Sequence, residues 1–315
     1  MTGFQRLCLL TGFVVFGLIV LGGVVRATDS GLGCPDWPRC HGSFIPKWEK
    51  HTLIEYSHRL VASVAGFLVL GIAVWAWRSY RRTPAVLLPA ALMLALIVVQ
   101  AGLGGAAVLN DLPPEIVVIH LGMALTILST LLVVLHTSFD LSRPLARLAA
   151  GPAVRGSALA ALAVAFLLML VGAYVAGADY GLACSGWPLC NGEVVPGAGG
   201  ASVQVHFIHR LLALLLGLTL VAVLWSAWRE RRRSGTVLLF AGGALAVYAV
   251  QALIGAANIW TELADEVSAA HLAFAELLWV LLAVFNIRLF EAHRWLPRAA
   301  AAPRSREMPA PGVPQ

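Results

Sequence analysis

The sequence predicts an all-α membrane protein in which eight transmembrane helices form two four-helix bundles. Three observations predict this fold class: few charged residues, eight long apolar stretches, and a second half that repeats the first. Hydrophobic residues make up 59% of the 315 residues and charged residues only 12%, whereas a soluble domain carries about 25% charged residues. The chain is therefore expected to lie in a lipid bilayer.

Each apolar stretch is long enough to cross a bilayer, which takes about 20 residues. The stretches lack the alternating polar positions of barrel strands, so we expect helices. The first is longer than the apolar run of about 7–15 residues in a signal peptide, and it has a counterpart inside the chain, so we expect it to be retained. The predicted spans are 4–25, 55–78, 85–109, 115–139, 156–178, 204–228, 236–258 and 266–290.

Arginines gather at one end of these spans and give their orientation. By the positive-inside rule the arginine-rich segments are cytoplasmic, which places both termini inside the cell. The net charge of +6 is therefore a topology signal, and we expect no binding to nucleic acid. A bacterial plasma membrane is the simplest location. These arginines are Arg78, Arg81, Arg82, Arg143, Arg147, Arg155, Arg229, Arg231, Arg232, Arg233, Arg294, Arg298, Arg304 and Arg306.

The two halves of the chain repeat each other. "GLGCPDWPRCHG" at 31–42 recurs as "GLACSGWPLCNG" at 181–192, and "EYSHRLVA" aligns with "HFIHRLLA". Because each half has four spans and starts on the same side, the repeat is parallel rather than inverted. The expected organisation is an N-terminal bundle at 1–142, a cytoplasmic linker at 143–155, a C-terminal bundle at 156–292 and a disordered cytoplasmic tail at 293–315.

Each half carries two cysteines separated by five residues, in a loop on the side away from the arginines. Disulfides persist on that side and are rare in the cytosol. The alternative is a zinc site completed by His41, but the second copy has Asn191 at that position. Cys8, in the first span, is expected to be a small buried apolar residue. The predicted disulfides are Cys34–Cys40 and Cys184–Cys190.

Four histidines recur at matched positions: His58, His120, His209 and His271. Each is expected near the outer end of its span, roughly 4–8 Å inside the helix start at 1.5 Å per residue. Histidine inside a membrane is costly and usually functional, although hydrogen bonding across helices is the alternative. Two imidazoles facing each other at one level suit the axial ligation of haem iron. Zinc or copper would need a third ligand, which Glu55 offers only in the first half.

Three charged residues lie beside these histidines. Arg59 and Arg210 directly follow two of them and are candidates for pairing with haem propionates, or for snorkelling to the interface. Glu55 lies three residues before His58 on the same helical face, and His206 takes its place in the second half. A carboxylate at one site could stabilise positive charge or transfer a proton, which makes Glu55 the catalytic candidate. The alternative is an acid of the first helical turn, stabilised by the helix dipole.

The motifs "EYSHR", "IHLGMAL", "HFIHR" and "AAHLAFAE", with the two Cys-x5-Cys loops, resemble the haem A synthase family over nearly the whole chain. The resemblance implies that haem O is converted to haem A: a ring methyl is hydroxylated twice and loses water to give a formyl group. It implies that the first half binds the substrate through His58 and His120, with Glu55 beside them. It implies that the second half holds the iron of a haem b cofactor through His209 and His271.

The resemblance also implies partners. These are haem O and haem A, membrane lipid, haem O synthase and cytochrome oxidase assembly proteins. Two other functions fit duplicated histidine pairs: a dihaem cytochrome that exchanges electrons with quinone, and a haem carrier without chemistry. A synthase is expected to contain haem b with haem O or haem A, a cytochrome two identical haems, and a carrier unaltered haem. Glu55 favours the synthase.

Overall fold

The computed structural model describes residues 1–143, 148–197, 199–232 and 235–290. Within these ranges eight α-helices are long and apolar enough to cross a membrane, and no strand is formed beyond two isolated bridges. The predicted all-α membrane fold is confirmed, and the tail predicted for 293–315 lies outside the described residues. The helices are α1 (Gly3–Ala27), α2 (Lys50–Ser79), α3 (Pro84–Leu109), α4 (Pro114–Ser142), α5 (Pro152–Gly177), α6 (Gly200–Arg229), α7 (Gly235–Trp260) and α8 (Asp265–Phe290).

Local sequence explains where several helices begin. Thr2 caps α1 with a capping box, in which Thr2 Oγ1 accepts from the Gln5 backbone N–H and the Gln5 side chain accepts from the Thr2 N–H. Helices α3, α4 and α5 each have proline at their first position. Proline favours that position because its backbone angle is already helical and the helix requires no N–H there.

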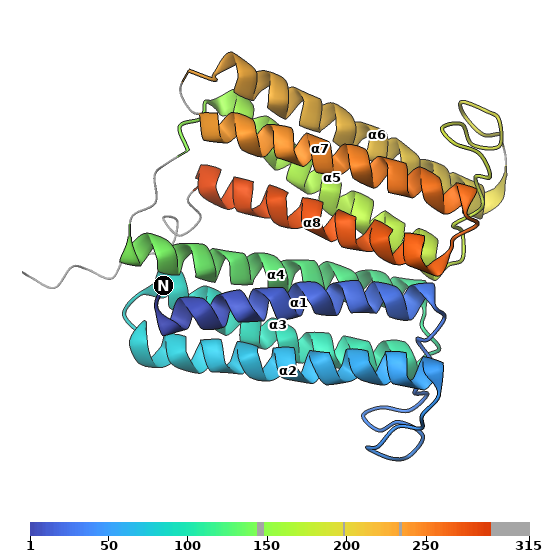
Figure 1. Cartoon of the computed structure of the whole chain (residues 1–315), viewed down its shortest axis with the longest axis horizontal. Coiled ribbons are helices and arrows are strands. Elements are labelled where there is room, and N and C mark those ends of the chain that lie inside the picture. Colours follow the sequence, from blue (N-terminus) through green and yellow to red (C-terminus); the bar gives the residue numbers. More distant parts are fainter. Residues whose placement is uncertain (144–147, 198, 233–234, 291–315) are drawn as a thin grey trace, which may run out of the picture.

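The helices form two rings that lie side by side (Figure 1). Helices α1–α4 contact one another in sequence and close through α1 and α4, and α5–α8 close in the same way through α5 and α8. The rings meet through α1, α4, α5 and α8, and Trp279 Nε1 on α8 donates to Ser129 Oγ on α4 at 3.1 Å. This contact pattern supports our proposal that the bundles divide between α4 and α5, although α5 begins at Pro152, inside the segment 143–155 predicted as the linker.

Three helices begin at least four residues earlier than hydropathy predicts. α2 starts at Lys50 rather than 55, α5 at Pro152 rather than 156, and α6 at Gly200 rather than 204. The additional turn of α2 is polar, so it does not register as membrane span. It is held by the loop before it, because Thr52 Oγ1 donates to the Gly33 carbonyl at 2.9 Å.

The earlier starts change the expected depth of the histidines. Measured from the helix start at 1.5 Å per residue, His58 lies about 12 Å and His209 about 14 Å along its helix. His120 and His271 lie about 9 Å along theirs. The expectation of 4–8 Å was therefore too short, because it counted only the apolar part of each helix.

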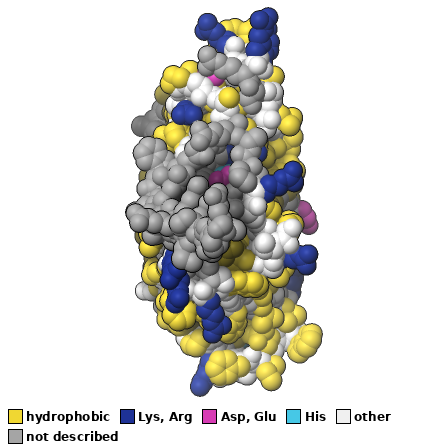
Figure 2. All heavy atoms as spheres, turned by 90° about the vertical axis from the view of Figure 1, so that its left-hand side faces the viewer, with side chains coloured by type: hydrophobic (Ala, Val, Ile, Leu, Met, Phe, Trp, Pro, Cys, Tyr) yellow, Lys and Arg dark blue, Asp and Glu magenta, His cyan; other side chains and the backbone are white. Residues whose placement is uncertain are grey.

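The disulfide loops and the arginines lie at opposite ends of the helices. In Figure 1 the loops project at the end where α1 finishes, away from the N-terminus. Figure 2 shows Lys and Arg side chains over the other end, where exposed residues such as Arg81 and Arg82 lie. This separation is the one the sequence predicts.

Arg26 joins the two rings at the end that carries the loops. Its guanidinium donates to Asp29 at 2.8 Å, to the Ala176 carbonyl at 2.6 Å and to Asp179. Asp29 and Asp179 are matched positions of the repeat, whereas the residue that matches Arg26 is Ala176 itself. One cation thus serves two equivalent carboxylates, one from each half.

We expect Arg26→Gln to lower the free energy of unfolding by about 1 kcal/mol, because both carboxylates are exposed and screened by solvent. Urea unfolding in detergent micelles measures this loss. A double-mutant cycle with Asp179→Asn should show positive coupling, while the loop variant Arg39→Gln serves as the control. Strictly additive losses for Arg26 and Asp179 would contradict the link between the rings.

Candidate functional site

A glycine of the preceding helix packs against each of the four matched histidines. A Cβ built on any of these glycines would press on the imidazole Cε1, at a distance shorter than ordinary van der Waals contact. Because glycine has no Cβ, it leaves room for the imidazole ring at that position. The pairs, with that distance, are Gly22–His58 (3.2 Å), Gly104–His120 (3.2 Å), Gly172–His209 (2.9 Å) and Gly255–His271 (3.0 Å).

All four imidazoles have a buried Nδ1 with no hydrogen-bond partner in the described part of the chain. A buried polar group left unpaired costs about 1–3 kcal/mol. On each ring Cε1 and Nδ1 are the atoms nearest to the glycine of the preceding helix, which leaves the Nε2 side of the ring for a ligand. His58 and His120 lie on α2 and α4 of the first ring, and His209 and His271 lie on the matching helices α6 and α8 of the second ring. In the second pair, His271 Nε2 also lies 3.4 Å from the Gln251 side-chain nitrogen.

Pairs of buried imidazoles in an apolar ring of helices suit the axial ligation of haem iron. Zinc or copper would need further ligands at the same level. Among the described residues no three His, Cys, Asp or Glu side chains come together as a metal site. The residues present therefore fit a haem in each ring better than a smaller metal centre.

The cysteines form the two predicted disulfides. Sγ–Sγ is 2.00 Å for Cys34–Cys40 and 1.96 Å for Cys184–Cys190. The zinc alternative is wrong, because the thiols are joined and His41 Nε2 lies 3.0 Å from the Gly33 carbonyl. Asn191 makes the equivalent contact in the second loop, donating to the Ala183 carbonyl at 3.1 Å. Cys8 is buried and free, as expected.

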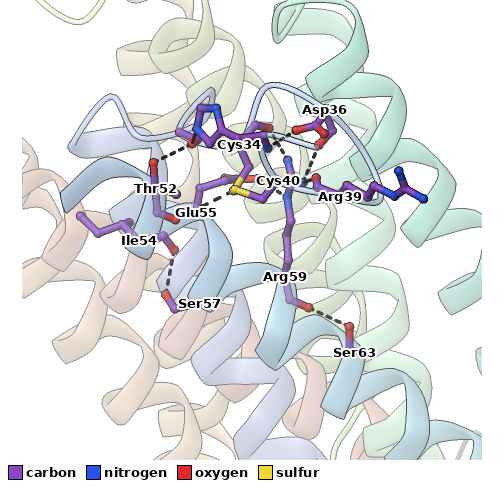
Figure 3. Close-up of polar contacts among 12 residues, drawn as sticks. Cys34, Asp36, Arg39, Cys40, Thr52, Ile54, Glu55, Ser57, Arg59 and Ser63 are labelled. Carbon is purple, nitrogen blue, oxygen red and sulfur yellow. Dashed lines mark hydrogen bonds and ion pairs between the residues drawn. A yellow bond between two sulfur atoms is a disulfide. The ribbon is translucent and has the colours of Figure 1, made fainter. Parts of the chain in front are cut away.

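Glu55 forms an ion pair with Arg59 beneath the first disulfide loop (Figure 3). Arg59 Nε donates to Glu55 Oε1 at 2.8 Å, and the two side chains are only 15% and 6% exposed. Because α2 begins at Lys50, Glu55 lies in the second helical turn. The helix dipole acts mainly within the first turn, so a guanidinium, rather than the helix end, balances this carboxylate.

The same arginine holds the disulfide loop. Arg59 donates to the carbonyls of Cys34 at 2.6 Å, Asp36 at 2.7 Å and Arg39 at 2.9 Å. Sequence reasoning missed this role, although the signal was present: an arginine follows the histidine in both copies of the loop-bearing repeat. Pairing of Arg59 with a propionate stays a prediction, and Figure 3 shows its side chain extended toward the loop.

Arg210 holds the second loop in the same way. It donates to the carbonyls of Cys184 at 2.8 Å, Gly186 at 2.6 Å and Leu189 at 3.0 Å. No carboxylate stands beside it at the Glu55 position, which is His206. Here too the propionate role stays a prediction.

His206 supports the second loop directly. Its Nδ1 lies 2.9 Å from the Tyr180 carbonyl and 3.4 Å from the Cys184 N–H. The first loop uses Asp36 instead, which accepts from the Gly42 and His41 backbone N–H groups at 2.7 and 2.5 Å. These hydrogen bonds lower the pKa of the Asp36 carboxyl below its ordinary value. The two disulfide loops are thus equivalent in the repeat but are held by hydrogen bonds from different side chains.

Together, the fold and the matched histidines are those of a multi-pass membrane protein in which each of two helical rings carries two buried imidazoles. The model of the COX15-CtaA family, described as cytochrome oxidase assembly protein, matches residues 5–283. The chain belongs to this family, which confirms the resemblance drawn from its motifs.

Several relatives are similar over most of their length. The heme A synthase of Shouchella clausii is 32% identical over 263 residues, which cover 82% of this chain and 87% of that protein. The heme A synthase of Symbiobacterium thermophilum is 33% identical, over 76% of this chain and 79% of its own length. That of Halalkalibacterium halodurans is 34% identical, over 69% and 74% respectively.

We expect Arg59→Met to destabilise the protein more than Arg210→Met. Each variant removes three hydrogen bonds to a disulfide loop, but only the first leaves a buried carboxylate without its cation. Breaking one side of a buried pair costs about 3–5 kcal/mol, so the difference between the variants should be about 3 kcal/mol. Urea unfolding in micelles, followed by circular dichroism, measures both losses.

The repeat supplies the matched control for this comparison, and a second substitution supplies the rescue. Glu55→Gln in the Arg59→Met background removes the uncompensated charge and should recover most of the additional loss. Equal losses in the two arginine variants, with no rescue, would contradict the importance of the ion pair.

Proposed function

We propose that this protein is a haem A synthase, which oxidises a ring methyl of haem O to the formyl group of haem A by successive hydroxylations. One observation carries the proposal: each ring has two buried imidazoles at matched positions, and only the first ring has a carboxylate, Glu55, one helical turn before a histidine, where the second ring has His206. Two equal sites with unequal surroundings suit a substrate and a cofactor better than two identical electron carriers. The names of the relatives support the same activity.

The first ring is the substrate half. His58 and His120 would hold the iron of haem O, and the glycines against them fix the level at which the macrocycle lies. The second ring is the cofactor half, in which His209 and His271 would hold haem b. When bound, haem b supplies one-electron redox chemistry. Gly172 and Gly255 position its two ligands.

Glu55 would act on the substrate. It lies one helical turn before His58, so both side chains leave α2 on the same face. Burial of the Glu55 side chain disfavours its ionised form, and the positive charge of the Arg59 guanidinium opposes that effect and favours the carboxylate. An ionised carboxylate at that place can stabilise positive charge developing at the ring methyl, or accept a proton from a water molecule. Arg59 also ties Glu55 to the disulfide loop, which would act as a lid over the substrate half.

The orientation of the protein in the membrane follows from the positions of its arginines. We infer that the arginine-rich end faces the bacterial cytoplasm and that the disulfide loops face the oxidising side of the plasma membrane. The expected partners are haem O synthase, which would supply the substrate, and cytochrome oxidase assembly proteins, which would receive haem A. Extraction and mass identification of haems from purified protein separates a synthase from a dihaem cytochrome or a carrier.

Replacement of either haem b ligand tests the cofactor half. His209→Leu and His271→Leu should each remove most of the haem b absorbance, because one axial ligand is lost and its place becomes apolar. His206→Gln is the control, since its side chain contacts only the loop in the proposed scheme. Reduced-minus-oxidised spectra and extracted haem content provide the measurement. Full haem b retention in both ligand variants would reject the assignment.

Replacement of Glu55 tests the substrate half. Glu55→Gln keeps shape and polarity but removes the charge, so haem A output should fall by about a hundredfold or more, the usual scale for a positioned acid or base. Haem b should remain, and haem O or a hydroxylated intermediate should accumulate. Chromatography of extracted haems measures all three. Near-normal haem A would make Glu55 dispensable, and loss of all haem would make it structural.

A further inference from the structure

Helix α8 carries polar or aromatic side chains where its repeat counterpart α4 carries leucine. The alignment that matches His120 with His271 gives three such positions. Polar side chains inside a bilayer are costly and usually functional, and these occur only in the proposed cofactor half. The matched positions are Leu125 and Glu276, Leu128 and Trp279, and Leu135 and Asn286.

One face of α8 leads from these residues into a groove between the two rings. The groove has a volume of about 490 Å³ and is lined by parts of α3, α4, α5 and α8, among them Leu92, Ser129, Thr130, Leu162 and Asn286. Leu92 is 52% exposed and Thr126, which also lines the groove, is exposed, so the groove opens on the outer surface of the helices, where lipid would lie. Ser129 joins it to the α8 face by accepting from Trp279.

The groove offers hydrogen-bond acceptors without donors. Asn286 is only 5% exposed, and its Nδ2 donates to the carbonyls of Ala158 at 3.1 Å and Leu282 at 2.9 Å. Its Oδ1 has no partner among the described residues. The hydroxyls of Ser129 and Thr130 donate to carbonyls of their own helix, which leaves only their lone pairs for a ligand. An unpaired buried acceptor is costly, so a donor is required there.

Glu276 lies on the same face of α8, nearer to His271. It is fully buried, and neither carboxyl oxygen has a partner in the described part of the chain. The order along α8 is then a haem ligand, an unpaired carboxyl, Trp279 about 12 Å from the ligand, and Asn286 about 22 Å from it, at 1.5 Å per residue. Along the helix axis, a titratable group thus lies between the level of the proposed haem ligand and the level of Asn286.

We propose that this groove binds an isoprenoid quinone, which accepts the electrons released by the reaction. The proposal rests on the proposed function. With water as the oxygen source, one methyl group and one water molecule give one formyl group while two quinones become two quinols. The four electrons and four protons that leave the methyl and the water are the ones that the quinones gain.

The chemistry of the groove matches this ligand. A quinol has hydroxyl donors for Asn286 Oδ1 and an apolar tail that can lie along Leu92 toward the lipid. A site that binds quinol through its hydroxyls favours the reduced form and so favours electron transfer to quinone. A phospholipid acyl chain also fits an apolar groove, but it carries no donor and would leave Oδ1 unpaired. Glu276 is the group on α8 placed to hand on protons.

The test uses haem-loaded protein in phosphatidylcholine nanodiscs, with decylubiquinone and decylubiquinol as probes. Decylubiquinol should raise the thermal unfolding midpoint in a saturable way, and decylubiquinone should reoxidise chemically reduced haem b with saturable kinetics. Asn286→Leu removes the acceptor at similar volume, and Thr130→Phe fills the groove from its half-buried α4 wall. Each should raise both half-saturating concentrations at least about tenfold, equivalent to about 1.4 kcal/mol of binding free energy. Leu239→Phe, on an exposed face of α7, should change neither.

The readouts separate this inference from the proposed function. If haem A is formed but quinol stabilisation is linear in concentration or unchanged in Asn286→Leu and Thr130→Phe, the quinone site is overturned and the synthase stands. Phospholipid that resists exchange and blocks quinol stabilisation would likewise overturn it. If stabilisation is saturable and lost in both variants although no haem A is formed, the groove stands and the synthase proposal fails.

Discussion

The contact between a glycine backbone and each imidazole is the constraint on which the rest of the structure depends. Each ring lies so close to the neighbouring helix that a Cβ on the glycine would press on it, so helix packing restricts the position of all four histidines, whose Nδ1 atoms have no partner in the described part of the chain. The helices must then be spaced to keep these contacts. Each of the two closed rings of four helices keeps two of these contacts. The order in which the helices contact one another is the same in both rings.

The repeat makes the departures from symmetry informative. Both loops are closed by a disulfide and held by an arginine on the following helix, so these parts belong to the scaffold. The residues that differ are Glu55 against His206 in the outer part, and Glu276 and Asn286 against leucines in the inner part. A shared scaffold does not require them. Their physical cost in a membrane is offset only if they serve chemistry that one half performs and the other does not.

Arg59 belongs both to the scaffold that the two halves share and to the part that differs between them. It is a scaffold residue, because Arg210 makes the same loop contacts, and it is also the cation that balances Glu55. The loop, the ion pair and the proposed substrate pocket are therefore coupled in the first half. In the second half His206 binds the loop without a charge partner. The contact between the arginine and the disulfide loop is thus present in both halves, but only in the first half does the neighbouring residue, Glu55, pair with that arginine.

The sequence by itself determined the membrane class, the eight spans, the repeat, the disulfide pairs and the four histidines, because hydropathy and internal similarity are local or linear properties of the chain. It did not determine where α2 begins, because the first turn of this helix is polar and is held by the loop before it rather than by lipid. Nor did it assign Arg59, Arg26 or Asn286, since each acts on groups distant in sequence. Only the tertiary structure brings a loop carbonyl, an aspartate of the other half or a groove between rings next to such a side chain.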